Sequence, residues 1–172
     1  MLREECETPF EHAVIETFYN TGCRIGEIYL LNRRDIDWER RAIIVTGKGD
    51  KEREVYFTVK ASIWLKKYLQ TRLDDIPALF VTRRKFKDSG DKPRRMSIAQ
   101  LRYVIKGIAD RAEIETNVYP HRLRHTFATH LLNNGAPLEM VSEQLGHSRV
   151  DVTRVYAFLS GERRRGLYNR YM

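Results

Sequence analysis

Apolar side chains recur every three or four residues in several stretches of the chain, which is the spacing of helices that bury one face. The clearest stretch is residues 10–19, FEHAVIETFY, and the turn sequence NTG that follows predicts where this helix ends. The same period predicts further helices around Ile25 to Leu31, at roughly 59–73, from Ser97 through Ile108, from Pro120 up to Gly135, from Pro137 up to Gly146, and across Val152 to Leu159.

Two stretches depart from this pattern and carry β-branched and aromatic residues, AIIVT at 42–46 and REVYFT at 53–58. The turn sequence Gly-Lys-Gly-Asp lies between them, so they are predicted to pair as a β-hairpin with Lys48 at its tip. LFVT at 79–82 is a candidate third strand. The predicted fold is therefore α+β and predominantly helical, with a small antiparallel sheet packed on helices.

The composition indicates a folded protein with a polyanionic partner. Of 172 residues, 42% are hydrophobic and 31% charged, which excludes disorder for most of the chain and predicts one domain, residues 1–172. Lys and Arg number 31 against 23 acidic residues, and the net charge of +8 makes nucleic acid the first candidate partner. Because no long apolar run and no signal peptide is found, we expect no membrane partner and a cytoplasmic location.

Neither the cysteines nor the histidines predict a metal site. Cys6 and Cys23 are not spaced as metal ligands, and we interpret both as free thiols, with a single bridge between them left open. His121 and His125 lie four residues apart, but Arg122 stands where zinc proteases carry a glutamate. We expect neither a metal nor a cofactor.

His121 and Arg124 lie three residues apart, so on a helix their side chains share a face. Alone, this pair is typical of the solvated side of a basic helix, and a tyrosine such as Tyr156 is usually part of a core. Several motifs in a fixed order change that interpretation.

Five segments together resemble the catalytic domain of the tyrosine recombinases, the phage-integrase and Xer-like family. They are TGCRIGEI around Arg24, TGKGDKER around Lys48, HRLRHTFATHLL with His121 and Arg124, LGHS with His147, and DVTRV before Tyr156. Their order and spacing extend over residues 10–160, which is nearly the full chain.

The resemblance implies a metal-independent enzyme that cleaves and rejoins DNA strands through a 3′-phosphotyrosyl intermediate. Tyr156 would be the nucleophile that attacks the scissile phosphorus. Arg24 and Arg124 would bind the non-bridging oxygens, because the guanidinium fork fits phosphate. His121 would take the tyrosine proton or donate a hydrogen bond, and His147 would donate one to phosphate.

The hairpin tip would bring Lys48 to the leaving 5′-oxygen as a proton donor. Glu27, one helical turn after Arg24, is expected to orient that guanidinium and not to act as a base. The segment 83–95, RRKFKDSGDKPRR, shows no hydrophobic period and is predicted to be a loop. Candidate DNA contacts on the hairpin and this loop are Lys51, Arg53, Arg83, Arg84 and Lys85.

The family also implies a homotetramer acting on two duplexes of double-stranded DNA, associated with the nucleoid. The basic segment 161–172 is either exchanged between subunits or a tail. Family members carry a separate N-terminal core-binding domain, which we expect to be absent from this chain. Two alternatives stay open: strand relaxation like that of a type IB topoisomerase, and a non-enzymatic helix-turn-helix DNA-binding protein.

Overall fold

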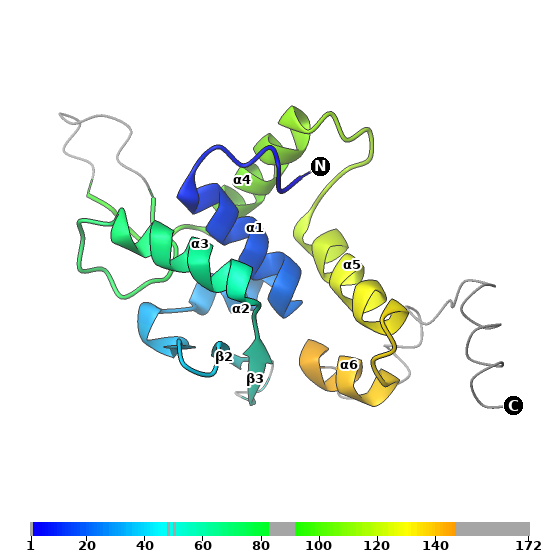
Figure 1. Ribbon diagram of the computed structural model, residues 1–172. Coiled ribbons are helices and arrows are strands. Elements are labelled where there is room, and N and C mark those ends of the chain that lie inside the picture. Colours follow the sequence, from blue (N-terminus) through cyan, green and yellow to red (C-terminus); the bar gives the residue numbers. More distant parts are fainter. Residues whose placement is uncertain (1, 48, 50, 83–91, 147–172) are drawn as a thin grey trace, which may run out of the picture.

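A computed structural model describes residues 2–47, 49, 51–82 and 92–146 (Figure 1). Its elements, in chain order, are α1 Pro9–Thr21, α2 Ile25–Leu30, the 3₁₀ turn η1 Arg33–Asp35, β1 Ile36–Asp37, β2 Ala42–Thr46, β3 Glu52–Tyr56, α3 Val59–Gln70, α4 Ile98–Arg111, α5 Pro120–Asn133 and α6 Leu138–Leu145. The predominantly helical α+β prediction is confirmed, and so is each predicted helix up to Gly146. The helix predicted across Val152 to Leu159 lies outside the described residues.

Helix α1 is the centre of the fold, and α3, α4 and α5 pack around it (Figure 1). It begins after Thr8, whose hydroxyl accepts a hydrogen bond from the backbone N–H of Glu11 at 3.2 Å. The predicted apolar stripe, Phe10, Val14 and Phe18, is buried in the main hydrophobic cluster. Most other side chains of α1 are buried as well, so the helix is enclosed on nearly all sides.

The predicted hairpin is present, with β2 paired antiparallel to β3 and Ile43 opposite Val55. The third strand is β1, which pairs with the other edge of β2 and gives the sheet order β1-β2-β3. The candidate strand at 79–82 was therefore wrong. Within the described residues that segment makes only an isolated bridge, between Val81 and Arg95.

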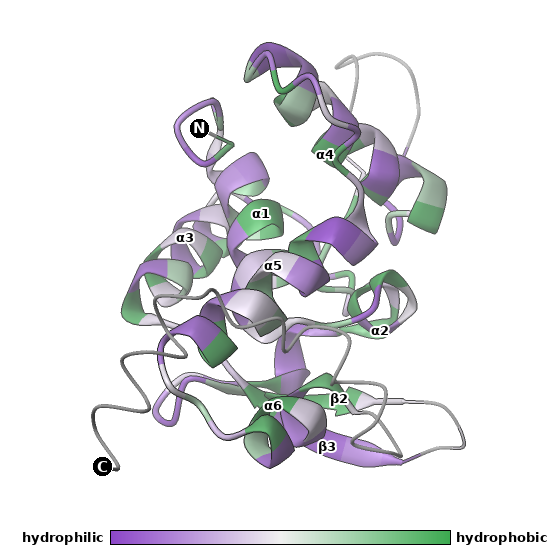
Figure 2. Cartoon of the chain, turned by 90° about the vertical axis from the view of Figure 1, so that its right-hand side faces the viewer, coloured by the Kyte–Doolittle hydropathy of each residue, from purple (hydrophilic) through white to green (hydrophobic). Residues whose placement is uncertain are grey.

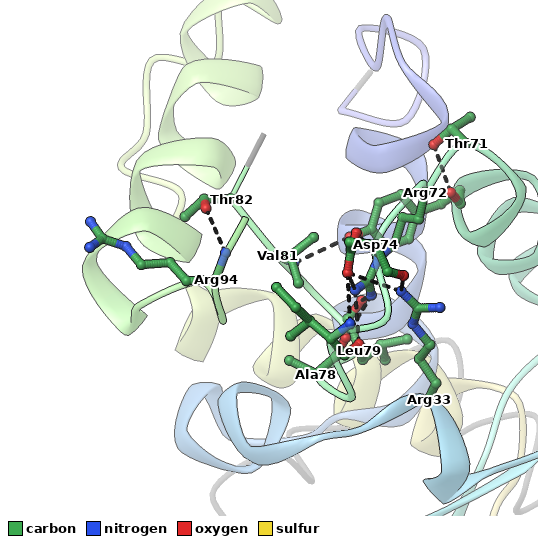
Figure 3. A network of polar contacts seen from close by, with 11 residues as sticks. Arg33, Thr71, Arg72, Asp74, Ala78, Leu79, Val81, Thr82 and Arg94 are labelled. Atoms are coloured by element: carbon green, nitrogen blue, oxygen red, sulfur yellow. Dashed lines mark hydrogen bonds and ion pairs between the residues drawn. The ribbon is translucent and has the colours of Figure 1, made fainter. Parts of the chain in front are cut away.

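The chain after α3 is held by a buried arginine (Figure 3). Arg72, 3% exposed at its side chain, binds Asp74 and donates to three backbone carbonyls within residues 76–79 at 2.6 to 3.0 Å. The arginine thus fixes the turn that leads from α3 into the segment 79–82. Helix α3 ends at Gln70, earlier than predicted, and Leu73, expected on the buried stripe, is fully exposed.

Helices α5 and α6 pack against each other through a second, smaller hydrophobic cluster, made of Phe127, Ala128, Leu132, Val141 and Leu145. In Figure 2, α5 lies over α1, and α6 lies over β3, in agreement with their contacts.

Gly22, which ends α1, touches this second cluster. Its φ of +61° is left-handed, and a Cβ at this position would lie 2.3 Å from Cδ1 of Phe127 and 3.1 Å from Cδ2 of Leu145. The turn between α1 and α2 therefore requires a residue without a side chain, for conformation and for space.

Replacing Gly22 by Ala should lower the free energy of unfolding by about 3 kcal/mol, because left-handed strain adds to overpacking. Gly135→Ala is the matched control, since Gly135 also has a left-handed φ, +96°, but no heavy atom of the described chain lies within 4 Å of a Cβ there. We expect the control to lose only about 1 kcal/mol. Urea unfolding of both variants measures the difference, and equal losses would contradict the packing argument.

Candidate active site

Arg24 lies at the beginning of α2, and its side chain is 45% exposed. Glu27, three residues later, accepts a hydrogen bond from the backbone N–H of Arg24 on Oε2 at 2.7 Å. Its Oε1 accepts a second one from Nη1 of Arg24 at 3.0 Å. One carboxylate therefore holds both the backbone and the guanidinium of Arg24.

The same carboxylate binds a second arginine. Arg53 of β3 donates from Nη1 to Oε1 and from Nη2 to Oε2 of Glu27, both at 2.9 Å. Glu27 is only 6% exposed. Burial alone would raise the pKa of Glu27, but the hydrogen bonds from Arg53 and from the Arg24 backbone, with the charges of both arginines, lower it. The group is therefore held as a carboxylate.

Arg53, which is predicted to contact DNA, also binds the end of α6. Its side chain is 13% exposed, and its Nε donates to the backbone carbonyl of Gln144 near the end of α6 at 3.0 Å. Burial would lower the pKa of Arg53, but the hydrogen bonds and charge of Glu27 raise it. With its two bonds to Glu27, Arg53 makes three hydrogen bonds inside the fold.

Arg124 of α5 is 2% exposed and joins two turns of the backbone. Its Nη1 donates to the carbonyl of Gly22 at 2.6 Å, and its Nη2 donates to the carbonyl of Leu145 at 2.7 Å. The end of α1 and the end of α6 are thus held by one guanidinium.

His121 lies in the first turn of α5 and is exposed. Its ring stacks on Tyr119 with centroids 6.5 Å apart and planes 11° apart. The predicted partners His121 and Arg124 therefore differ in environment, because one faces solvent and the other is enclosed by backbone carbonyls.

An open pocket lies between α2, the β2–β3 hairpin and the end of α6. Arg24 and Glu27 line it from the α2 side, Lys51 and Arg53 from the hairpin, and Gly146 from α6. Neither His121 nor Arg124 is part of its lining. The structure thus brings together Arg24 and Glu27 of the first motif, Lys51 and Arg53 of the second, and the glycine of the fourth.

Six predicted residues lie outside the described residues: Lys48, Arg83, Arg84, Lys85, His147 and Tyr156. Two of them directly follow pocket residues in the sequence. Gly47 lines the pocket and precedes Lys48, and Gly146 lines it and precedes His147.

No group of three or more His, Cys, Asp or Glu side chains that could hold a metal ion is found among the described residues. Cys6 and Cys23 are both free and buried, and burial raises the pKa of each thiol to about 11. Thiols with such pKa values are poor nucleophiles at neutral pH. No helix within the described ranges is long and apolar enough to cross a membrane.

The contact between Glu27 and Arg53 was not predicted from the sequence. The two residues are separated by 26 positions and belong to a helix and a strand, and no local spacing rule connects such a pair. The contacts with the carbonyls of Gln144 and Leu145 could not be predicted either. Every residue carries a carbonyl, and only the fold brings these two to Arg53 and Arg124.

Comparisons with known proteins agree on one family. Residues 2–163 match the Phage integrase family. The tyrosine recombinase XerC of Oceanobacillus iheyensis is 37% identical over 158 residues, which cover 92% of this chain and 52% of the relative. The tyrosine recombinase XerD of Ralstonia nicotianae is 38% identical over 165 residues, which cover 92% of this chain and 51% of the relative. The crystal structure of XerA recombinase superposes with a TM-score of 0.83 at 30% identity, covering 99% of this chain and 60% of that one. The chain spans about half the length of the curated relatives it matches.

Replacing Glu27 by Gln should destabilise the protein in a pH-dependent way. At neutral pH the variant leaves Arg53 buried without its counter-charge, so we expect the free energy of unfolding to fall by about 3 kcal/mol. Because the folded-state pKa of Glu27 is lowered from its ordinary 4.5, its contribution is complete above that value and is lost as pH falls through the folded-state pKa. The difference between wild type and variant should therefore shrink in acid.

Glu54→Gln is the matched control, because Glu54 pairs with Arg40, whose side chain is 63% exposed. Its loss should stay below about 1 kcal/mol. Chemical denaturation of the three proteins across the acid range tests this, and a wild-type-to-Glu27→Gln difference that does not change with pH would contradict the assignment.

Proposed function

The chain belongs to the phage integrase family, and from this premise we propose that residues 1–172 are the catalytic domain of a site-specific DNA recombinase. The proposed enzyme cleaves and rejoins strands of double-stranded DNA through a 3′-phosphotyrosyl intermediate. Relatives named as tyrosine recombinases favour this activity over topoisomerase-like relaxation and over a non-enzymatic helix-turn-helix protein.

The observation that carries the proposal is the meeting of motifs that lie far apart in the chain. Arg24 of TGCRIGEI, Lys51 of TGKGDKER and Gly146 of LGHS line one pocket. Arg124 of HRLRHTFATHLL donates to the carbonyls of Gly22, which belongs to TGCRIGEI, and of Leu145, which belongs to LGHS. Such convergence is what a site assembled around one phosphate requires.

In the proposed reaction, the phenolic oxygen of Tyr156 forms a bond to the scissile phosphorus, and the bond from phosphorus to the 5′-oxygen breaks. His121 takes the phenolic proton or assists its loss, because a phenol with a pKa near 10 is a weak nucleophile at neutral pH. Arg24 and Arg124 stabilise the charge on the non-bridging oxygens. Attack by a 5′-hydroxyl on the phosphotyrosine reverses the chemistry and rejoins a strand.

Lys48 is proposed to give a proton to the departing 5′-oxygen, and His147 to donate a hydrogen bond to phosphate. Both assignments are supported by their neighbours in the chain, since Gly47 and Gly146 line the pocket. The Cα atoms of consecutive residues are about 3.8 Å apart, so each of the two residues is covalently held next to a residue that lines the pocket.

The proposed partners are double-stranded DNA and three further copies of the chain in a synaptic tetramer. Lys51 and the basic stretch Arg83, Arg84 and Lys85 are proposed to contact phosphates, and segment 161–172 is proposed to exchange between subunits. The proposed location is the cytoplasm, at the nucleoid.

A suicide-substrate experiment tests the activity. A randomised library of nicked duplexes is incubated with the protein, so that cleavage next to the nick releases a short fragment and traps the enzyme on DNA. Wild type should give a covalent adduct on a denaturing gel. Tyr156→Phe, which lacks only the hydroxyl, should give none.

The adduct should also form in EDTA, since the proposed chemistry uses no metal. Loss of the adduct in the chelator, or its persistence in Tyr156→Phe, would contradict the mechanism.

Replacing Arg24 by Lys should lower the rate of adduct formation by about a hundredfold to a thousandfold, because an ammonium cannot offer the forked donors of a guanidinium. Arg40→Lys is the control, since Arg40 is exposed and pairs with Glu54 on the sheet. Single-turnover kinetics on a duplex selected from the library measure both rates. Equal rates for the two variants would remove Arg24 from the site.

A further inference from the structure

We propose that Arg53 is a positioning residue, which couples Arg24, through Glu27, to the end of α6. This inference rests on the proposed function, because it assigns a part in the same reaction. It replaces the sequence-based expectation that Arg53 contacts DNA.

Each nitrogen of the Arg53 guanidinium donates a hydrogen bond within the fold. Nη1 and Nη2 each bind one oxygen of Glu27 at 2.9 Å, and Nε binds the carbonyl of Gln144 at 3.0 Å. The planar guanidinium thus joins Glu27 to the end of α6. Arg53 therefore lines the pocket with its donors bound to Glu27 and to α6, which fits a role in positioning the groups beside it.

The fold leaves space for this guanidinium only because residue 146 is a glycine. Gly146 has a left-handed φ of +62°, and a Cβ there would lie 2.8 Å from Nη1, 2.9 Å from Cζ and 3.0 Å from Nε of Arg53. The guanidinium therefore packs directly on the backbone of Gly146. The glycine of LGHS serves both to end α6 and to admit Arg53.

The C-terminal end of α6 favours a cation electrostatically. The last carbonyls of α6 lack partners within the helix and form the negative end of its dipole. A cation at Gln144 is favourable there, and it is held in place by the buried carboxylate of Glu27. Lysine could supply the charge, but it could not supply three donors in a fixed plane.

The consequence is a fixed relation between two parts of the pocket. Glu27 also binds the backbone and the guanidinium of Arg24, at 2.7 and 3.0 Å. The chain continues from Gly146 into His147, and Tyr156 follows nine residues later. Arg53 therefore links Arg24, the proposed phosphate-binding arginine, to Gly146, the last described residue before the proposed nucleophile in the sequence.

The test compares Arg53→Met and Arg53→Lys with Lys51→Met, an exposed cation of the same hairpin. On a duplex selected from the nicked library, both Arg53 variants should lower the single-turnover rate of adduct formation by about a hundredfold, because small misplacements of reacting groups have effects of this size. Their dependence of DNA affinity on salt should match wild type. Lys51→Met should instead reduce the salt slope by about one phosphate contact.

Measurements without DNA test whether Arg53 couples Arg24 to the end of α6. The amide of Gly146, which donates to the carbonyl of Glu143 at 2.8 Å, should exchange its hydrogen about tenfold faster in Arg53→Met. The ¹⁵N–¹H signal of the Arg24 Nε should shift in the same variant. Neither should change in Lys51→Met.

Gly146→Ala provides a variant that displaces Arg53 without replacing it, and should lower the adduct rate as the Arg53 variants do. Gly135→Ala, which carries left-handed strain with no described neighbour within 4 Å, should keep the wild-type rate. Thermal unfolding of every variant confirms that it is folded.

The outcomes separate this proposal from the proposed function. A salt slope reduced in Arg53→Met, a rate restored by Arg53→Lys, or unchanged Gly146 exchange and Arg24 signals would each overturn the positioning role. If wild type forms no adduct with any duplex, the proposed function fails, and the exchange and NMR readouts still decide whether Arg53 couples Arg24 to α6.

Discussion

The end of α6 is held by two guanidinium groups, and the geometry of the pocket depends on this attachment. Arg53 donates to the carbonyl of Gln144 and Arg124 to the carbonyl of Leu145. A helix leaves its last carbonyls unpaired, so cations at this end satisfy hydrogen bonds and the dipole together. Each cation is itself anchored in the first third of the chain, one by Glu27 and the other by the carbonyl of Gly22.

Glu27 and Arg53 are a buried ion pair at a place where apolar side chains could also pack. Removing a carboxylate and a guanidinium from water is unfavourable, and buried ion pairs are often no more stabilising than well-packed apolar side chains. What the pair of Glu27 and Arg53 provides is direction, because bidentate bonds fix both side chains in one plane. The small cluster between α5 and α6 packs these helices together but does not set the position of individual donors.

Much of the fold follows from local pattern. The buried stripe of Phe10, Val14 and Phe18 and the hairpin of 42–46 with the following strand were predicted correctly, because helix and strand periods are local properties. The resemblance to the tyrosine recombinases is confirmed by the family match. The third strand was assigned to the wrong segment. The run at 79–82 makes one isolated bridge, and β2 pairs instead with Ile36–Asp37, which is too short for a strand period to reveal.

For the candidate site, the sequence indicated which residues are candidates. The tertiary structure decided which of them bind protein groups and which are exposed. Arg24, Glu27 and Arg124 belong to motifs that resemble those of the tyrosine recombinases, and this resemblance predicts a phosphate site there. The sequence could not distinguish Arg53 from Lys51, because two cations on one hairpin differ only in what lies opposite them. The fold sets Glu27 and the end of α6 opposite Arg53. A buried cation must bind the acceptors that surround it, whereas an exposed cation such as Lys51 remains hydrated.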